Sequence, residues 1–197
     1  MDIQTKNMNL LFDLDEPAPP QIDGLDYLPD FITLDEQSVL IAHVDQQSWL
    51  SDLKRRVQHY GYKYDYKART ITQDSYLGAL PDWLQSITKK LPFAPDQAIV
   101  NEYQPGQGIS AHIDCEPCFC DTIASLSLGN AATMQFTKDN HKKEIYLAPR
   151  SLITLSAEAR YKWTHAIPAR KSDIIDGMKV PRERRISITF RKVKSLM

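Results

Sequence analysis

Long hydrophobic segments are missing from this sequence of 197 residues. No uninterrupted apolar run approaches the roughly 20 residues that a transmembrane helix needs, so we expect no membrane partner. The N-terminus also lacks the basic start and the long apolar stretch of a signal peptide, which favours a cytoplasmic protein. The chain has 42% hydrophobic and 25% charged residues, and this composition excludes a collagen-like fibre, a coiled coil and a chain that is disordered throughout.

Cysteine is scarce, and the three cysteines all lie between positions 115 and 120. Cysteines so close together cannot join distant parts of the chain, which excludes a disulfide scaffold and fits a reducing compartment. We expect Cys115, Cys118 and Cys120 to be buried or loop thiols. A zinc site with His141 as fourth ligand is an alternative, but it requires the loop to fold back on itself.

Basic residues are almost absent from the first 47 positions, although the whole chain has a net charge of only −1. This segment holds ten acidic residues and one lysine, a net charge of −9, so the remaining 150 residues carry +8. The asymmetry suggests a basic working face and makes nucleic acid a candidate partner. The alternative is that acidic and basic side chains simply solvate different surfaces.

The length fits one well-buried domain and is too short for two comfortable ones. Residues 1–24 are acidic and contain three prolines, and we expect them to form a tail. The compact domain is expected over residues 25–197.

Two helices and eight short strands are predicted in this domain. Thr33 and Glu36 have the spacing of a capping box, which predicts a helix that runs to about residue 47, and a second helix is expected over residues 80–91. The strands are expected at residues 99–103, 109–113, 122–128, 133–136, 144–147, 152–155, 165–167 and 185–191. Short strands spaced by loops favour a mainly β, α+β sandwich or jelly roll, with the helices covering one sheet.

Three residues could bind a metal ion. His112 and Asp114 stand two positions apart, and on a strand such residues point to the same face. His165 follows beside another β-like segment. Two histidines and one carboxylate on one face of a metal leave three positions open, the arrangement suited to Fe(II) oxygenases. A histidine that bonds a nearby carboxylate in an ordinary turn is the alternative.

The segment at residues 185–191 has two different faces. One face is apolar, and the other carries two arginines and two hydroxyls: Arg185, Ser187, Thr189 and Arg191. That polar face suits a small dianion, because guanidinium groups bind carboxylates through two hydrogen bonds. Asn101 and Tyr103 share a strand face and offer an amide and a phenol to the same kind of ligand. An edge strand with a solvated basic face is the alternative.

Together these features resemble the AlkB family of Fe(II)- and 2-oxoglutarate-dependent dioxygenases over about residues 54–197. The resemblance rests on four motifs: Asn101-Glu102-Tyr103, His112-Ile113-Asp114, His165 and the closing Arg185-Ile-Ser-Ile-Thr-Phe-Arg191. It implies a double-stranded β-helix over about residues 98–192, with Fe(II), 2-oxoglutarate and dioxygen as cofactors. By this resemblance, iron would be bound by His112, Asp114 and His165. The residues that would hold 2-oxoglutarate are Asn101, Tyr103, Arg185 and Arg191.

The resemblance also implies an activity, the oxidative dealkylation of N-alkylated nucleobases in DNA and/or RNA during repair of DNA damage. The N-alkyl carbon is hydroxylated while 2-oxoglutarate becomes succinate, and the product then releases an aldehyde and restores the base. We expect a monomer, and a base in duplex must be extruded to reach the site. The alternatives are an oxygenase that acts on tRNA, a protein or a lipid, and a non-catalytic nucleic-acid-binding module.

Residues 54–69 look like the nucleotide-recognition lid of AlkB proteins, which we place at about 54–70. The segment contains six basic residues, one acidic residue and four tyrosines at alternate positions. Basic side chains bind phosphates, and aromatic rings stack on unpaired bases. We therefore expect substrate contacts from Arg55, Arg56, Tyr62 and Tyr64. Because the tyrosines share one parity, packing of some of them in a core is the alternative.

Two positions depart from the best-known bacterial repair enzyme of the family. Ser187 stands where that enzyme has asparagine, so one cosubstrate contact differs. Glu116 stands where it has an aspartate that bears on base selection, which makes Glu116 a further candidate for substrate binding.

Overall fold

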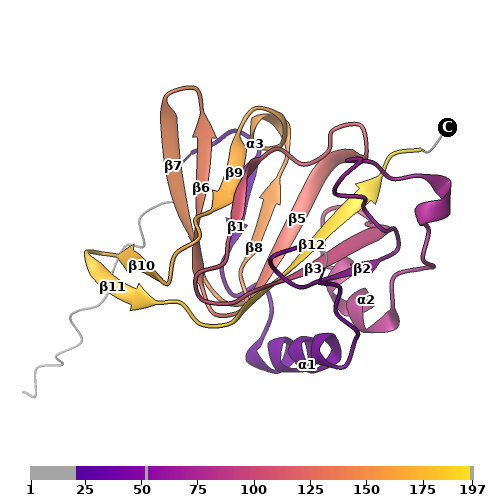
Figure 1. Ribbon diagram of the computed structural model, residues 1–197, viewed down its shortest axis with the longest axis horizontal. Helices are drawn as coiled ribbons and strands as arrows, with labels where there is room; N and C mark the ends of the chain where they lie inside the picture. The colour runs from indigo at the N-terminus through magenta and orange to yellow at the C-terminus, as the bar shows by residue number, and fades with distance from the viewer. Residues whose placement is uncertain (1–20, 52, 196–197) are drawn as a thin grey trace, which may run out of the picture.

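The computed structural model describes residues 21–51 and 53–195 of the chain (Figure 1). Two antiparallel sheets pack face to face around a shared core, and a separate β-hairpin projects from one end of the domain. The larger sheet has six strands in the order β1-β8-β5-β12-β3-β2, and the smaller has four in the order β4-β9-β6-β7. This is the mainly β, α+β jelly roll that the sequence predicts.

The strands of the large sheet are β1 (Leu25–Leu28), β2 (Val57–Tyr60), β3 (Gln97–Tyr103), β5 (Phe119–Gly129), β8 (Leu152–Leu155) and β12 (Arg185–Val193). Those of the small sheet are β4 (Ile109–His112), β6 (Ala132–Lys138), β7 (His141–Leu147) and β9 (Thr164–Ile167). The hairpin consists of β10 (Ser172–Ile175) and β11 (Met178–Pro181), and the α-helices are α1 (Leu34–Asp45), α2 (Asp82–Thr88) and α3 (Ala157–Tyr161). Within the described chain, no helix combines the length and the apolar character that a membrane crossing requires.

Each of the eight predicted strands is present, although most of their ends differ by one or more residues. The predicted capping box is confirmed, because the Glu36 amide donates to Thr33 and the Thr33 amide donates to the Glu36 carboxylate. The second helix is shorter than predicted and ends at Thr88. Leu91 is buried from a turn beyond the helix, and the α conformation is disfavoured there because Pro92 follows it.

Helices α1 and α2 cover one face of the large sheet (Figure 1). Leu40 and Val44 of α1 and Leu84 and Ile87 of α2 pack in one cluster with the apolar residues of β3, β5 and β12. The other face of the large sheet packs against the small sheet through a second cluster, which includes Phe136 of β6. The large sheet is therefore buried on both faces.

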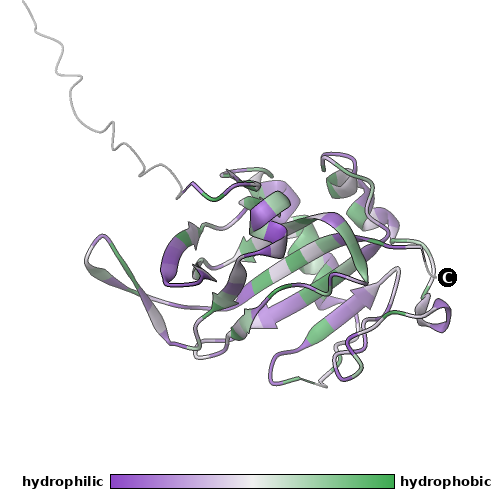
Figure 2. Ribbon diagram, turned by 90° about the horizontal axis from the view of Figure 1, so that it is seen from above, coloured by the Kyte–Doolittle hydropathy of each residue, from purple (hydrophilic) through white to green (hydrophobic). Residues whose placement is uncertain are grey.

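Strand β12 lies inside the large sheet, between β5 and β3. Figure 2 shows hydrophobic and hydrophilic bands alternating along the strands, as the period of two requires. In β12, Ile186, Ile188 and Phe190 belong to the cluster beneath the helices. The alternate residues, with the two arginines, are also buried but face a cavity between the sheets.

The end of the acidic stretch expected over residues 1–24 is part of the folded domain, whereas residues 1–20 lie outside the described residues. Ile22 is 5% exposed and packs in the cluster between the sheets. The amide of Ala159 donates a hydrogen bond to the carbonyl oxygen of Asp23. Packing of the described chain thus begins by Ile22, slightly before the expected boundary at residue 25.

The core of the large sheet yields a prediction for stability. Leu126 is 0% exposed beneath the two helices, so Leu126→Ala should lower the free energy of unfolding by about 2–5 kcal/mol through lost burial and a residual cavity. Val39 is 56% exposed on α1, and Val39→Ala should change the free energy by about 0.5 kcal/mol or less. Denaturant titration of both variants tests this, and equal losses of unfolding free energy would contradict the assignment of Leu126 to the core.

Candidate metal centre and cosubstrate pocket

A cavity of about 380 Å³ lies between the two sheets. This volume falls within the usual range for small-molecule sites. Strands β3, β5 and β12 of the large sheet line one side, strands β4, β6 and β9 of the small sheet line the other, and the segment around residues 53–69 contributes further side chains. All seven residues predicted to bind the metal or the cosubstrate line this one cavity.

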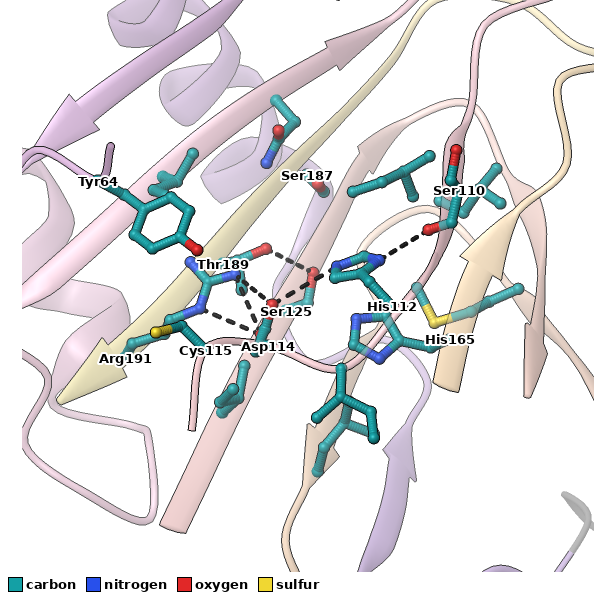
Figure 3. Close-up of a pocket in the computed structure, with 18 of the residues that line it drawn as sticks. Tyr64, Ser110, His112, Asp114, Cys115, Ser125, His165, Ser187, Thr189 and Arg191 are labelled. Atoms are coloured by element: carbon teal, nitrogen blue, oxygen red, sulfur yellow. Dashed lines mark hydrogen bonds and ion pairs between the residues drawn. The ribbon is translucent and has the colours of Figure 1, made fainter. Parts of the chain in front are cut away.

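His112, Asp114 and His165 converge in the cavity, as the sequence predicts (Figure 3). The two histidines are cross-strand partners on β4 and β9, and their ring centroids are 4.4 Å apart. Asp114 lies just beyond the end of β4 and still turns back toward them. One ligand atom from each residue lies within 4.8 Å of the others, and among the described residues this is the one group of histidines, cysteines and acids with the spacing of a metal site.

The surroundings of the two imidazoles leave a ring nitrogen of each without a hydrogen-bond donor role. His112 Nδ1 lies 2.8 Å from the carbonyl oxygen of Ser110, and because a carbonyl can only accept, Nδ1 carries the hydrogen and Nε2 is left with its lone pair. Burial lowers the pKa of His165 to about 4, so this ring is neutral at neutral pH. Its Nδ1 is buried and has no hydrogen-bond partner within the described chain, as expected of a nitrogen reserved for a ligand.

Asp114 is a buried carboxylate, 8% exposed, with charged partners. Burial alone raises its pKa, but the nearby Arg191 guanidinium outweighs that effect and holds the pKa well below its usual range. Arg191 Nε and Nη2 each lie 3.2 Å from Asp114 Oδ2, on the side away from His112 (Figure 3). Arg160 of α3 donates to the Asp114 carbonyl oxygen across 3.0 Å. Asp114 is therefore ionised and held from two directions.

Arg185 is a buried cation, 2% exposed, at the first position of β12. Its Nη2 donates to Ser127 Oγ across 2.8 Å, but its Nε and Nη1 have no partner within the described chain. Burial lowers its pKa to about 10, which leaves the guanidinium charged at neutral pH. Unfilled donors on a buried guanidinium are costly unless a carboxylate or similar acceptor binds them.

Asn101 and Tyr103 complete this side of the cavity. They lie on β3 directly opposite Ser187 and Arg185 of β12. The guanidinium carbon of Arg185 is 5.5 Å from the centroid of the Tyr103 ring. An amide, a phenol and a cation with unfilled donors fit a small dianion such as 2-oxoglutarate, and the nearby histidines and carboxylate fit Fe(II).

Only two of the five residues expected to contact substrate line the cavity. Arg55 and Tyr64 line the cavity, whereas Arg56, Tyr62 and Glu116 are not among the described residues that line it. Arg56 binds the Glu102 carboxylate, at 2.6 and 2.8 Å, and lies over the Trp49 ring.

Tyr62 and Glu116 have other surroundings. Tyr62 is bridged to Tyr76, with ring centroids 5.0 Å apart, and Glu116 is exposed on the loop after Asp114.

Three residues near the site were not singled out from the sequence. Tyr66 and Arg69 line the cavity beside Tyr64, and the Tyr64 and Tyr66 rings meet edge to face at 5.2 Å. The alternation of tyrosines carried the signal for Tyr66, and the local excess of basic residues carried the signal for Arg69. No sequence pattern pointed to Arg160, because its role depends on α3 packing against the loop after β4.

The prediction of free thiols is wrong for two of the three cysteines, because Cys115 and Cys118 form a disulfide. The turn brings their Cα atoms to 5.3 Å, within the range that a disulfide spans. Cys120 is free, and the described residues show no zinc site with His141. The Sγ atoms of Cys115 and Cys118 lie 3.3 and 3.6 Å from the carbonyl oxygen of Arg69, so the disulfide packs the loop after Asp114 against the segment that carries the tyrosines.

Comparison with known proteins agrees with this geometry. The family model described as the 2OG-Fe(II) oxygenase superfamily matches residues 42–191. Among solved structures, OsALKBH1 superimposes with a TM-score of 0.69 at 17% identity, over 86% of this chain and 96% of that chain, which shows the fold.

Three relatives are similar in sequence over most of this chain. The "Alkylated DNA repair protein ALKBH8 homolog" of Arabidopsis thaliana is 40% identical, over 88% of this chain and 59% of its own length. An uncharacterized protein of Acanthamoeba polyphaga mimivirus is 39% identical, over 87% of this chain and 86% of its own length. The "tRNA (carboxymethyluridine(34)-5-O)-methyltransferase ALKBH8" of Mus musculus is 37% identical, over 98% of this chain and 32% of its own length.

The chain thus spans about three-fifths of the Arabidopsis relative and one-third of the mouse relative. Fe(II), 2-oxoglutarate and dioxygen are the cofactors of the superfamily whose model it matches. The chain belongs to the AlkB family of Fe(II)- and 2-oxoglutarate-dependent dioxygenases.

Proposed function

We propose that this dioxygenase oxidises an alkyl group on a nucleobase of DNA or RNA. In this proposal His112, Asp114 and His165 hold Fe(II). The residues that bind 2-oxoglutarate are Asn101, Tyr103, Arg185 and Arg191. The supporting observation is that both sets of residues line one cavity, and that the segment around residues 53–69 adds aromatic and basic side chains to its lining. Such a wall suits an unpaired base and its phosphates.

When bound, Fe(II) and 2-oxoglutarate would supply the oxidation, in which dioxygen hydroxylates a C–H bond and 2-oxoglutarate is converted to succinate and carbon dioxide. The protein supplies two imidazoles, of which that of His165 is neutral, and an ionised carboxylate as ligands, and Arg185 offers its unfilled donors to a cosubstrate carboxylate. Tyr64 and Tyr66 line the cavity and reduce the access of water. If the oxidised carbon is attached to a base nitrogen, the hydroxylated product releases an aldehyde and the base is restored.

A modified uridine in tRNA is the second candidate substrate. The observation that favours it is the name of the mouse relative, which is 37% identical over nearly the whole of this chain. In this case hydroxylation occurs on a carbon-linked substituent, and no aldehyde is released. Repair of alkylated DNA remains the first candidate, in line with the name of the Arabidopsis relative.

The two candidates are separated by assaying succinate formation with matched substrates. These are a methylated single-stranded DNA, the same sequence as RNA, and an anticodon stem-loop with a carboxymethyl group on uridine 34. Mass spectrometry of the products distinguishes loss of the alkyl group from addition of one oxygen. If no nucleic acid raises succinate formation above the level without substrate, the nucleic-acid proposal is wrong and a protein or lipid substrate replaces it.

The proposed metal ligands give one prediction. His112→Ala and Asp114→Ala should each abolish turnover of 2-oxoglutarate and most of the Fe(II) binding, because two remaining ligands do not hold the metal. His141→Ala is the matched control, since it removes an exposed histidine outside the site and should change neither property. Metal titration under anaerobic conditions and circular dichroism check binding and folding. Unchanged turnover with equal bound iron would falsify the triad.

Arg185 gives a prediction for the cosubstrate. A charge-assisted hydrogen bond contributes about 1.5–3 kcal/mol, so Arg185→Met should weaken 2-oxoglutarate binding roughly 10- to 100-fold. Arg150→Met removes an arginine that pairs with Asp30 at the surface and should leave the affinity unchanged. Calorimetry with the Fe(II)-loaded protein measures both. An affinity within twofold of the parent for Arg185→Met would show that Arg185 does not bind the cosubstrate.

The tyrosines give a prediction for the substrate. Tyr64→Ala should weaken oligonucleotide binding by about 1–3 kcal/mol if the ring stacks on a base, and Tyr64→Phe should retain most of the affinity. Tyr62 is the matched control, because it packs in the same small cluster but not in the cavity. Fluorescence anisotropy provides the measurement. Equal losses for Tyr62→Ala and Tyr64→Ala would indicate that the loss is structural and that Tyr64 makes no base contact.

A further inference from the structure

Two neighbouring arginines before β2 approach β3 from opposite sides. Arg55 lines the cavity, and its Nε donates to Asn101 Oδ1 across 2.9 Å. Arg56 instead binds Glu102, the next residue of β3, whose side chain points to the other face. The sequence assigns both arginines to substrate phosphates, but Arg55 contacts a residue proposed to hold 2-oxoglutarate.

The contact with Arg55 determines which end of the Asn101 amide is the oxygen. An arginine has only donors, so the group that Arg55 meets must be the amide oxygen. The NH₂ end of the amide is then left for another partner, and no hydrogen bond within the described chain uses it. Asn101 is buried and lines the cavity, so its NH₂ group is available there to an acceptor such as a carboxylate.

Arg55 also adds positive charge beside Arg185. The guanidinium carbons of Arg55 and Arg185 lie 5.8 and 5.5 Å from the centroid of the same ring, that of Tyr103. Neither arginine forms an ion pair with an acid of the described chain, whereas Arg191 is paired with Asp114. Two cations near one ring repel each other, and a bound dianion removes that repulsion.

We infer that Arg55 is a positioning residue for 2-oxoglutarate, which holds the Asn101 amide with its NH₂ group toward the cosubstrate. The inference rests on the proposed function, in that Asn101 belongs to the cosubstrate site. It also reassigns Arg55 from the nucleic-acid backbone to the cosubstrate pocket. The stretch of chain that leads to Tyr64 is thereby linked to the cosubstrate through Asn101.

The test is a double-mutant cycle on 2-oxoglutarate affinity, measured by calorimetry with the Fe(II)-loaded protein under anaerobic conditions. Arg55→Met keeps the aliphatic stem and removes the donor, and it should raise the dissociation constant fivefold or more. In the Asn101→Ala background the same change should have a clearly smaller effect, because the amide through which Arg55 acts is gone and only its charge beside Arg185 remains. Lys54→Met is the control for overall charge, since Lys54 is exposed and outside the cavity, and it should have no effect.

A second measurement separates the cosubstrate role from a phosphate contact. The salt dependence of oligonucleotide binding should be the same for Arg55→Met and Lys54→Met. A slope that falls by about one unit only in Arg55→Met would assign Arg55 to a phosphate and overturn the inference. Thermal denaturation checks that Arg55→Met is folded. If it is not, Arg55→Lys replaces it, and this variant should lie between the parent and Asn101→Ala in affinity.

The remaining outcomes are equally decisive. An effect of Arg55→Met that is the same with and without Asn101, or one below twofold, shows that Arg55 does not act through the amide. If Arg185→Met and Asn101→Ala also leave the affinity unchanged, the proposed cosubstrate site itself is wrong. If those two weaken binding and Arg55→Met does not, only the inference about Arg55 fails.

Discussion

The ionised carboxylate of Asp114 constrains the whole site, because a charge so deeply buried needs charged or hydrogen-bonding partners. Arg191 approaches the carboxylate from β12 of the large sheet, and His112, two residues earlier in the chain, lies 3.5 Å from its other oxygen. Arg160 of α3 donates to the backbone carbonyl oxygen of the same residue. Asp114 thus ties together both sheets and a helix. The same charge favours the binding of a cation by the proposed metal ligands.

Strand β12 carries Arg191, the main partner of the Asp114 carboxylate, and connects it to the rest of the fold. It is hydrogen-bonded on both edges and buried on both faces, so its side chains have little freedom to move. The apolar residues hold it against α1 and α2, and the alternate residues project into the cavity. A site built on such a strand is held by the packing of the core and needs no ordered loop to place its arginines. A substitution on either face of β12 is therefore expected to shift the residues on the other face.

Much of the site follows from local rules of sequence. The spacing of His112 and Asp114, the alternation of residues 185–191 and the capping box at Thr33 each depend on a period or an offset that the backbone enforces. The choice of partners does not follow from such rules. Arg55 and Arg56 are the same residue type in adjacent positions, and only the placement of β3 decides that one meets Asn101 and the other Glu102.

Other features were missed for different reasons. The disulfide of Cys115 and Cys118 depends on a turn that the sequence does not specify. The hairpin of β10 and β11 is not among the predicted strands, even though Asp176-Gly177, a strong hairpin signal, stands at its turn. Helix α3 is five residues long, too short for a hydrophobic period to be recognised.

The segment between β2 and α2 has a hydrophobic cluster of its own. Its isolated bridges, Tyr62 to Tyr76 and Asp65 to Thr70, lie within the segment itself. Ile71, Tyr62 and Tyr64 pack with the disulfide, Phe119 of β5 and Val193 of β12. These three residues belong to neither of the two larger hydrophobic clusters, although the small cluster rests on strands of the large sheet. During divergence from a common ancestor, such a chain can alter which molecule it admits while its oxidative machinery stays the same. Residues that select the substrate and residues that carry the oxidation can then change independently, which is consistent with one fold being shared by relatives named for different substrates.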